Sequence, residues 1–316
     1  MSRVSPNFML VRLRNQRLAG AKAASAAEVV GWFGAVQAQD YGGAKWALAL
    51  RTKNARESDV ETAFASGAII RTHVLRPTWH FVLPADLRWM LALTAPRVRQ
   101  AMAFHDSYYG IDDRTVSRAQ AALAKALAGS RHRTRSELAE IVGATGQKLA
   151  GILIRAELDA LVCSGPRRGK QFTYALVSDR CPPAPRLDRD EALGRLAERY
   201  FRSHGPALAQ DFAWWSGLTV ADARHAIGVA GLESRGGYWS GSWSAAASRG
   251  PIAHLLPSFD EFLVAYRVRE TRELSQRVLL NGRIVGSWTR LSARLNRAEK
   301  QALAAAIARR SRYGSD

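Results

Sequence analysis

Apolar positions recur at helical spacing along most of the chain, which predicts a mainly helical fold. Helices are expected at 8–18, 25–36, 58–66, 85–100, 114–127, 134–142, 147–161, 190–203, 207–215, 220–229 and 297–310. Shorter runs of alternating or β-branched residues predict strands between these helices. Strand pairs are expected within 69–82, 162–176, 236–248 and 278–288, the last around the hairpin turn Asn281-Gly282.

The stretch from Val36 to Arg51 differs from its surroundings because it joins two glutamines to a Gly-Gly turn. Gln37 and Gln39 are two apart, so in an extended segment both side chains point to the same side. After the turn, apolar residues at every second position from 46 to 50 predict a further extended segment. A carboxamide is neutral at every pH and both donates and accepts hydrogen bonds. The pair can therefore orient a water, although a solvated helix end is the simpler interpretation of the motif alone.

Helix, turn, helix and β hairpin follow one another three times along the chain. This order is typical of a winged helix-turn-helix, so the sequence predicts an α+β, mainly helical fold with three tandem winged units. The expected ranges are 1–110, which carries both glutamines, 111–182, 183–250, and 251–316 for a small C-terminal β element with a final helix. A proline-rich segment at 180–186 is the expected linker before the third unit.

The second unit has the most specific local pattern. Thr134 and Glu137 form a capping box at the start of one helix, and a basic hairpin tip follows the next helix. The tip holds Arg167, Arg168 and Lys170, which suits contact with a polyanion. Many winged helices bind proteins instead, and the three cations argue against that alternative.

Positive charge is the most informative property of the composition. Lys and Arg number 46 against 27 Asp and Glu, a formal net charge of +19 at pH 7. A GC-rich genome explains the preference for Arg over Lys but not the shortage of acids. Such an excess in a non-repetitive chain favours a nucleic-acid partner, most often DNA. A ribosomal, RNA or membrane-surface partner is the alternative.

The sequence indicates no membrane helix, metal or cofactor. No apolar run reaches about 18 residues, and the first residues lack the pattern of a secretory signal. Cys163 and Cys181 form neither a disulfide framework nor a metal motif, which fits a reduced cytoplasmic compartment. His73 and His80 lack cysteine or acidic companions at ligand spacing, so packing or a phosphate contact is expected for them.

Basic residues near these motifs are the candidates for DNA contact. The candidates are Lys45, Arg71, Arg76, Lys148, Arg155, Arg167, Arg168 and Lys170. Lys45 and Arg76 rank first because they neighbour the glutamine motif and the first hairpin. Lys170 and Arg168 follow because they lie at a wing tip, where phosphate contacts are common. For each candidate, an ordinary solvated cation is the alternative.

Two acidic residues stand together in the C-terminal region. Asp260 and Glu261 follow the segment His254-Leu255-Leu256-Pro257. Adjacent residues in regular structure point in different directions, so a catalytic carboxylate pair is not expected from them.

Three motifs together resemble the AlkZ and YcaQ type of bacterial DNA glycosylases. Gln37-Ala38-Gln39 is similar to the QxQ motif of the AlkZ branch. The first hairpin, from Arg71 to His80, and the segment from His254 to Pro257 resemble two further family motifs. The resemblance covers nearly the whole chain. It implies three winged helices around a basic concave face, with His80 in the first wing and His254 to Pro257 as a DNA-contacting hairpin near the lesion.

The resemblance also implies a monofunctional DNA glycosylase that hydrolyses the N-glycosidic bond of N-alkylated purines, with Gln37 and Gln39 positioning the water. Bulky N7-guanine adducts and interstrand crosslinks are candidate substrates, and some relatives of this kind confer self-resistance to DNA-alkylating natural products. Double-stranded DNA is then the partner of a nucleoid-associated, cytoplasmic monomer that needs no cofactor. The alternative is a non-catalytic winged-helix DNA-binding protein, either a transcriptional regulator or a damage-binding factor.

Overall fold

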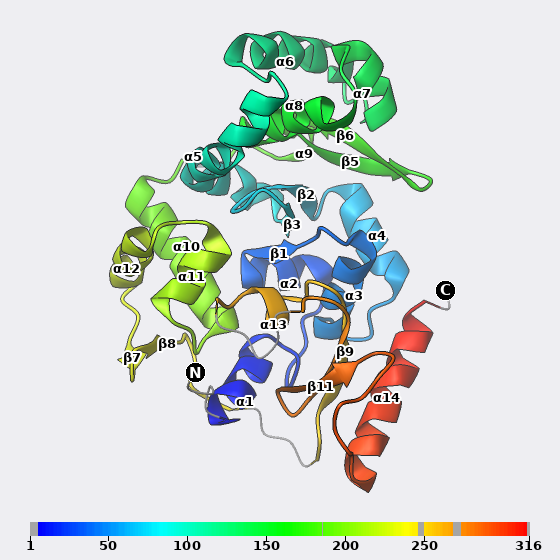
Figure 1. Cartoon of the computed structure of the whole chain (residues 1–316), viewed down its shortest axis with the longest axis vertical. Helices are drawn as coiled ribbons and strands as arrows, with labels where there is room; N and C mark the ends of the chain where they lie inside the picture. Colours follow the sequence, from blue (N-terminus) through cyan, green and yellow to red (C-terminus); the bar gives the residue numbers. More distant parts are fainter. Residues whose placement is uncertain (1–5, 185, 246–249, 268–272, 315–316) are drawn as a thin grey trace.

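Helices make up most of the chain, and small antiparallel sheets lie between them (Figure 1). The computed structural model describes residues 6–184, 186–245, 250–267 and 273–314. The expected α+β, mainly helical class is confirmed. Within the described ranges, no helix combines the length and the apolar character that a membrane span requires.

The N-terminal region forms five helices and one three-stranded sheet within the described residues. Its elements are α1 (Pro6–Asn15), α2 (Ala26–Phe33), β1 (Ala35–Gln37), α3 (Tyr41–Arg51), α4 (Glu57–Ser66), β2 (Ile70–His73), β3 (Trp79–Val82) and α5 (Pro84–Tyr108). The sheet is antiparallel, in the order β1-β3-β2. The Ser25 side chain caps α2 by accepting a hydrogen bond from the Glu28 backbone N–H, at 3.1 Å, as the sequence predicts.

The extended segment predicted at 46–50 is wrong, because these residues belong to helix α3. The Asp40 side chain caps this helix by accepting a hydrogen bond from the Gly43 backbone N–H at 3.1 Å. Every residue from Ala44 to Arg51 is buried. A helix that is buried on all sides has no polar face, so its sequence lacks the helical period and alternation arises by chance.

The second unit follows the predicted order of elements. Its elements are α6 (Asp113–Leu127), β4 (Arg133–Thr134), α7 (Arg135–Val142), α8 (Gly146–Leu158), β5 (Val162–Arg168), β6 (Gln171–Leu176) and the short α9 (Val177–Arg180). The capping box of Thr134 and Glu137 is present at the start of α7. In Figure 1 this green unit lies at the top, and the β5–β6 hairpin extends to the right beyond its helices.

The rest of the chain forms a helical layer and a small C-terminal sheet. Its elements are α10 (Arg189–His204), α11 (Ala209–Ser216), α12 (Val220–Val229), β7 (Ser234–Arg235), β8 (Tyr238–Trp239), β9 (Ala253–Leu256), α13 (Glu261–Val264), β10 (Arg277–Leu280), β11 (Arg283–Ser287) and α14 (Arg297–Tyr313). The hairpin predicted at 236–248 pairs only over β7 and β8, and residues 246–249 lie outside the described residues. The turn Asn281-Gly282 joins β10 to β11 as predicted.

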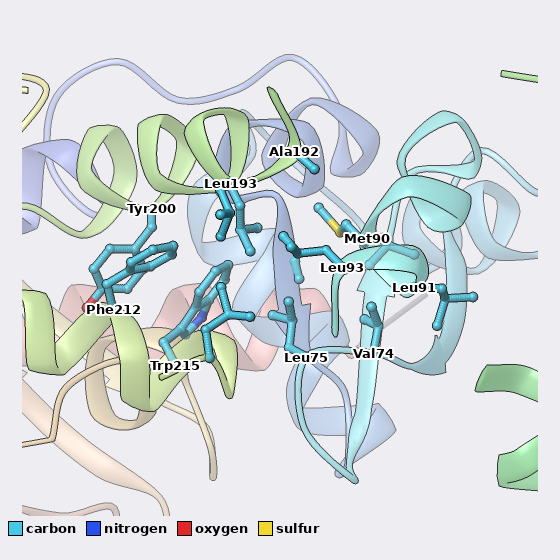
Figure 2. Packing of buried hydrophobic residues seen from close by; sticks show 14 of the residues in the cluster. Val74, Leu75, Met90, Leu91, Leu93, Ala192, Leu193, Tyr200, Phe212 and Trp215 are labelled. Carbon is cyan, nitrogen blue, oxygen red and sulfur yellow. The ribbon is translucent and has the colours of Figure 1, made fainter. Parts of the chain in front are cut away.

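The largest apolar cluster draws residues from all four predicted ranges. Figure 2 shows Leu75, which follows β2, and Met90 of α5 facing Leu193 of α10. Tyr200 and Trp215 continue the same cluster toward α11. The four ranges therefore share one core, and the division into separate winged units stays a prediction.

Candidate functional site

The first sheet places Gln37 in a row of three polar side chains. Gln37 on β1 lies opposite His80 on β3, and His80 lies opposite Thr72 on β2. Side chains directly opposite each other project from the same face of a sheet. The preceding row on this face is wholly apolar and belongs to the largest cluster. The polar row therefore begins where the apolar core ends, and two of its three members, Thr72 and His80, are themselves buried.

Both motif glutamines reach one hydroxyl group. The backbone N–H of Ala38 donates to the carbonyl of Trp79 at 2.7 Å, so the pairing of β1 with β3 continues past Gln37. The Thr78 hydroxyl donates to Oε1 of Gln39 at 3.0 Å and accepts from Nε2 of Gln37 at 3.4 Å. The two carboxamides thus share one small space, as their spacing suggests.

The two glutamines differ in exposure, which gives the pair a buried end and an open end. Gln37 is half-buried, and its Oε1 atom has no hydrogen-bond partner among the described residues. Gln39 is exposed to solvent. A buried acceptor oxygen without a partner is costly unless a water or ligand satisfies it. The geometry can therefore hold a water between the sheet and solvent.

His80 is buried beside this pair and is neutral. Its Nδ1–H donates to the backbone carbonyl of Thr78 at 2.9 Å, which leaves Nε2 as an acceptor without a described partner. Burial, followed by repulsion from Arg76, lowers the pKa of His80 to about 3. The DNA contact predicted for His80 would have to be made by a buried, uncharged ring whose Nδ1 already binds the Thr78 carbonyl.

Glu261 lies directly behind Gln37, and sequence reasoning missed it. Its Oε1 accepts the backbone N–H of Gln37 at 2.7 Å, while Oε2 accepts from Trp215 Nε1 at 3.0 Å and His204 Nε2 at 3.3 Å. The residue is 1% exposed. Burial alone would raise the pKa of Glu261, but the bonds from His204 and Gln37 lower it below the ordinary value. A buried negative charge therefore supports the motif from below.

Asp260 serves a different partner, as the expected divergence of the two acids requires. Its carboxylate binds Nη1 and Nη2 of Arg51, each at 2.8 Å. Both groups are buried, so the pair fixes the end of α3 to the segment before α13. In the sequence these residues appear only as two adjacent acids within an apolar run. That pattern alone does not reveal the role of either one.

Arg71 contacts the motif from the opposite face of the sheet. Its Nε donates to the backbone carbonyl of Ala38 at 3.0 Å, and its guanidinium lies 4.1 Å from the ring centre of Trp79 and 4.7 Å from that of Phe172. Burial lowers the pKa of Arg71 to about 10. Arg71 also lines a cavity of about 410 Å³ that Lys170 and Phe172 share.

Lys45, which ranks first among the predicted DNA contacts, is held inside the protein. It is 5% exposed, and its ammonium pairs with Glu57 and Glu61. Arg167 also pairs with Glu61, at 3.0 Å. A buried cation with two carboxylate partners is not free to reach a phosphate, so the prediction for Lys45 is corrected to an internal ion pair.

The other predicted cations lie nearer the surface. Arg168 is exposed on the β5–β6 hairpin and pairs with Glu137 at 3.1 Å, and Lys170 is exposed at the tip of this hairpin. Lys148 is half-buried at the start of α8. Arg155 is committed to Asp106 and to a second acid, each at 3.1 Å.

Arg76 lies where the first and third units meet. It is half-buried, and its Cγ lies 3.5 Å from the position that a Cβ on Gly217 would occupy. Arg76 also acts on the neighbouring His80 ring, whose protonation its charge opposes. The charge of Arg76 therefore acts on the polar row of the first sheet.

The His254–Pro257 segment reaches the motif through its proline. His254 lies on β9 opposite Leu279, is 4% exposed, and its pKa is lowered well below the ordinary value by burial and then by Lys22. The DNA contact expected of its side chain is therefore not available. Pro257 instead lies beside the first turn of α3, with its Cβ 3.2 Å from the position of a Cβ on Gly43.

The described residues of this site include no cluster that could form a metal centre. Among the described residues, no three His, Cys, Asp or Glu side chains come together as ligands for a metal ion. The chemistry that this site offers comes from neutral amides, a hydroxyl and a buried carboxylate.

Comparisons with known proteins agree on one family. The sequence matches the family described as DNA glycosylase AlkZ-like over residues 30–312. An interstrand DNA cross-link repair glycosylase from Streptomyces sahachiroi is 25% identical over 228 residues, a match that covers 66% of this chain but only 59% of that relative. The structure of the Streptomyces sahachiroi DNA glycosylase AlkZ has a TM-score of 0.79 at 22% identity, over 99% of this chain and 97% of that one. Because the family match covers most of its length, this chain belongs to the AlkZ-like DNA glycosylase family.

Proposed function

We propose that this chain is a monofunctional DNA glycosylase that hydrolyses the N-glycosidic bond of N-alkylated purines. The observation that carries the proposal is the meeting of the Gln37 and Gln39 carboxamides at the Thr78 hydroxyl, with Gln37 Oε1 left without a described partner. A water bound to these amides would be the nucleophile. The name of the Streptomyces relative, a cross-link repair glycosylase, supports the same class of reaction.

The leaving group explains why neutral amides are sufficient. Alkylation at N7 or N3 gives the purine a positive charge, so the base departs without a general acid. The sugar then develops positive charge, and the enzyme must orient a water toward C1′. Groups that are fixed before the reaction stabilise the developing charge at little cost. The buried carboxylate of Glu261, 2.7 Å from the Gln37 backbone nitrogen, adds a fixed negative charge beside this pair.

We further propose that three tandem winged units form a basic concave face that binds double-stranded DNA. The element order of the second unit and the net charge of +19 support this arrangement. The proposed contacts are Arg71, Arg76, Lys148, Arg168, Lys170 and the loop at Pro257. The protein would act as a monomer on chromosomal DNA in the bacterial cytoplasm.

The substrates that we propose include bulky N7-guanine adducts and interstrand crosslinks. Gln39 is exposed to solvent, so the open end of the pair can meet a lesion that stays in the groove. A bulky base of this kind need not be flipped into a closed pocket. The cross-link repair activity named for the relative agrees with such a substrate.

The test is release of free base from a duplex that carries one N7-methylguanine. Wild type should release the base, and the Gln37→Ala, Gln39→Ala double variant should be slower by about a hundredfold or more, the range for losing preorganised groups. Gln301→Ala, an exposed glutamine on α14, is the matched control and should keep the wild-type rate.

The other outcomes separate the alternatives. Equal release by wild type and the double variant would contradict the assignment of the two glutamines. Release by neither protein, from this duplex or from one with a bulky N7-guanine adduct, together with a footprint on one operator sequence, would favour a transcriptional regulator.

A further inference from the structure

The cavity of about 410 Å³ beside Arg71 has no role in the hydrolysis proposed above. It lies between the first sheet and the second unit, on the sheet face opposite Gln37, because Arg71 and Trp79 alternate with the polar row. Its walls include the start of α7 and the β5–β6 hairpin. The question is which chemical group such a cavity accepts.

Three positive charges converge on it. Arg71, Arg135 and Lys170 line the cavity, and none of the described residues that line it is acidic. Arg135 and Lys170 are exposed, whereas Arg71 is 6% exposed and has no ion-pair partner within the described part of the chain. Burial disfavours the charge of Arg71, and the buried carboxylate of Glu157, which is already paired with His73, offsets this only in part, because the pKa of Arg71 is still lowered to about 10. This imbalance favours an anionic occupant.

Two aromatic residues of the cavity lining, Trp79 and Phe172, are poorly placed to stack on a planar ligand. The Arg71 guanidinium covers one side of Trp79 and one of Phe172, and the His73 ring centre lies 4.1 Å from that of Trp79. Arg167 lies 5.3 Å from the ring centre of Phe172. Both rings are therefore already in contact with other side chains, which disfavours stacking on a planar ligand. The rings contact the flat face of the Arg71 guanidinium. The edge that carries its N–H groups therefore remains to face an occupant.

Neutral donors complete the lining. Ser136 and Thr134 contribute hydroxyl groups at the N-terminus of α7, an eight-residue helix whose first backbone N–H groups favour anions. The nearby acid, Glu137, is already bound to the Thr134 backbone N–H and to Arg168 at 3.1 Å. Hydroxyl groups, helix N–H groups and guanidinium edges are the donors that phosphate oxygens prefer.

We infer that this cavity binds one phosphate of the DNA backbone and so sets the register of the strand on the enzyme. This inference rests on the proposed function, because that function supplies DNA as the partner. Trp79 joins the two sites, since it lines the cavity and its backbone N–H donates to Gln39 Oε1 at 3.4 Å. A phosphate bound in this cavity would lie close to Gln37 and Gln39, separated from them by strand β3.

The test is binding to duplexes in which one backbone phosphate at a time is replaced by an uncharged methylphosphonate. Each duplex carries N7-methylguanine on a 2′-fluoro sugar, which resists hydrolysis, so binding is measured without excision. The variant is Arg135→Gln with Lys170→Gln, because both side chains are exposed and the bond that Arg135 donates to the Gly146 carbonyl, at 2.7 Å, also lies at the surface. Arg114→Gln with Arg118→Gln, two exposed cations on α6, is the matched control.

Wild type and the control should bind about tenfold more weakly when one particular phosphate near the lesion is replaced. For the Arg135→Gln, Lys170→Gln variant, the same replacement should weaken binding by less than about twofold, because the partner charges are gone; this is the logic of a double-mutant cycle. The salt slope for binding by this variant should be smaller by about 0.9, because the protein then neutralises one phosphate fewer.

Two results would overturn the inference. In the first, the variant is as sensitive as wild type to replacement of every phosphate. In the second, inorganic phosphate at constant ionic strength raises the melting temperature of wild type but not of the variant, while no backbone position distinguishes them; the cavity would then be a site for free phosphate. If wild type shows the expected dependence on one phosphate but does not excise the base, only the proposed function is contradicted.

Discussion

Three hydrogen-bond donors meet at the carboxylate of Glu261, and one of them is the backbone N–H of Gln37. At the scale of single residues, this arrangement explains how a motif of neutral side chains is held in place. A peptide N–H bound to a buried charge is fixed more firmly than one bound to water, because such bonds are charge-assisted. The Gln37 side chain then begins from a defined backbone position.

Replacing Glu261 with glutamine should weaken both the fold and the reaction. A carboxamide offers one acceptor oxygen where the carboxylate offers two, so at least one buried donor loses its partner, at about 1–3 kcal/mol. The unfolding midpoint in urea should fall accordingly. The excision rate at saturating DNA should fall by more than the change in folded fraction, because the carboxylate that fixes the backbone of Gln37 is also removed.

The control for this prediction is Glu140→Gln, an exposed acid on α7. It should change neither the urea midpoint nor the rate. A Glu261→Gln protein that keeps the wild-type rate would show that the carboxylate contributes packing only.

Buried histidines make stability depend on pH. Burial lowers the pKa of His80 to about 3 from an ordinary 6.5, and it also lowers the pKa values of His204 and His254. Below pH 6.5 the unfolded chain binds protons that the folded chain does not, so stability is complete above that pH and falls as the pH decreases. Each such histidine costs about 1.4 kcal/mol per pH unit in that window.

The measurement is the urea midpoint at about pH 7.5 and about pH 5.5. We expect a lower midpoint at the acidic pH, and a smaller drop for His80→Asn, whose side chain does not titrate. Equal drops in the two proteins would show that His80 is protonated in the folded state.

At the scale of elements, helix α3 connects the motif to the C-terminal segment. Asp40 caps its first turn, and Pro257 packs against Gly43 in the same turn. A Cβ on Gly43 would lie 2.6 Å from Asp40 Oδ2 and 3.2 Å from Pro257 Cβ, while the nearest such contact for Gly42 is 3.8 Å. A side chain is therefore tolerated less well at Gly43 than at Gly42.

Gly43→Ala should displace the cap and cost about 1 kcal/mol or more. Gly42→Ala should be neutral or stabilising by up to about 1 kcal/mol, because alanine favours a helix. Urea unfolding of the two variants compares them directly. Equal midpoints would mean that the first turn of α3 is loose enough to accept a methyl group at either position.

Local patterns predict elements well where the determinants lie within a few residues. The cap of Ser25, the capping box at Thr134 and the turn Asn281-Gly282 were all predictable because each is complete in the sequence itself. Helix α3 was not, because burial on all sides removes its polar face. Glu261 was not, because its partner Gln37 is distant in the chain and no local pattern connects them.

At the scale of the whole molecule, the predicted units share an apolar core. The largest cluster includes Ile70 from the first range, Leu158 from the second, Trp215 from the third and Tyr266 from the last. The buried pair of Arg51 and Asp260 adds a further long-range link, and removing one partner would leave an unpaired buried charge. Such units cannot unfold independently without exposing the core of the others.

Thermal unfolding of the full chain should therefore be a single transition. Helix content, measured by circular dichroism, and tryptophan fluorescence should change at the same temperature, since coincident probes are the mark of cooperative unfolding. Two separate transitions would show that at least one predicted unit is stable alone.

The bond between Glu261 and Gln37 also orders events during protein synthesis. The two residues are 224 positions apart, so a long stretch of chain is synthesised between the motif and the carboxylate that holds it. A growing polypeptide with both glutamines would lack the charge that fixes them, and so would any product of an interrupted translation. We expect partial chains that stop before Glu261 to lack the proposed activity, because the carboxylate that holds Gln37 is missing from them.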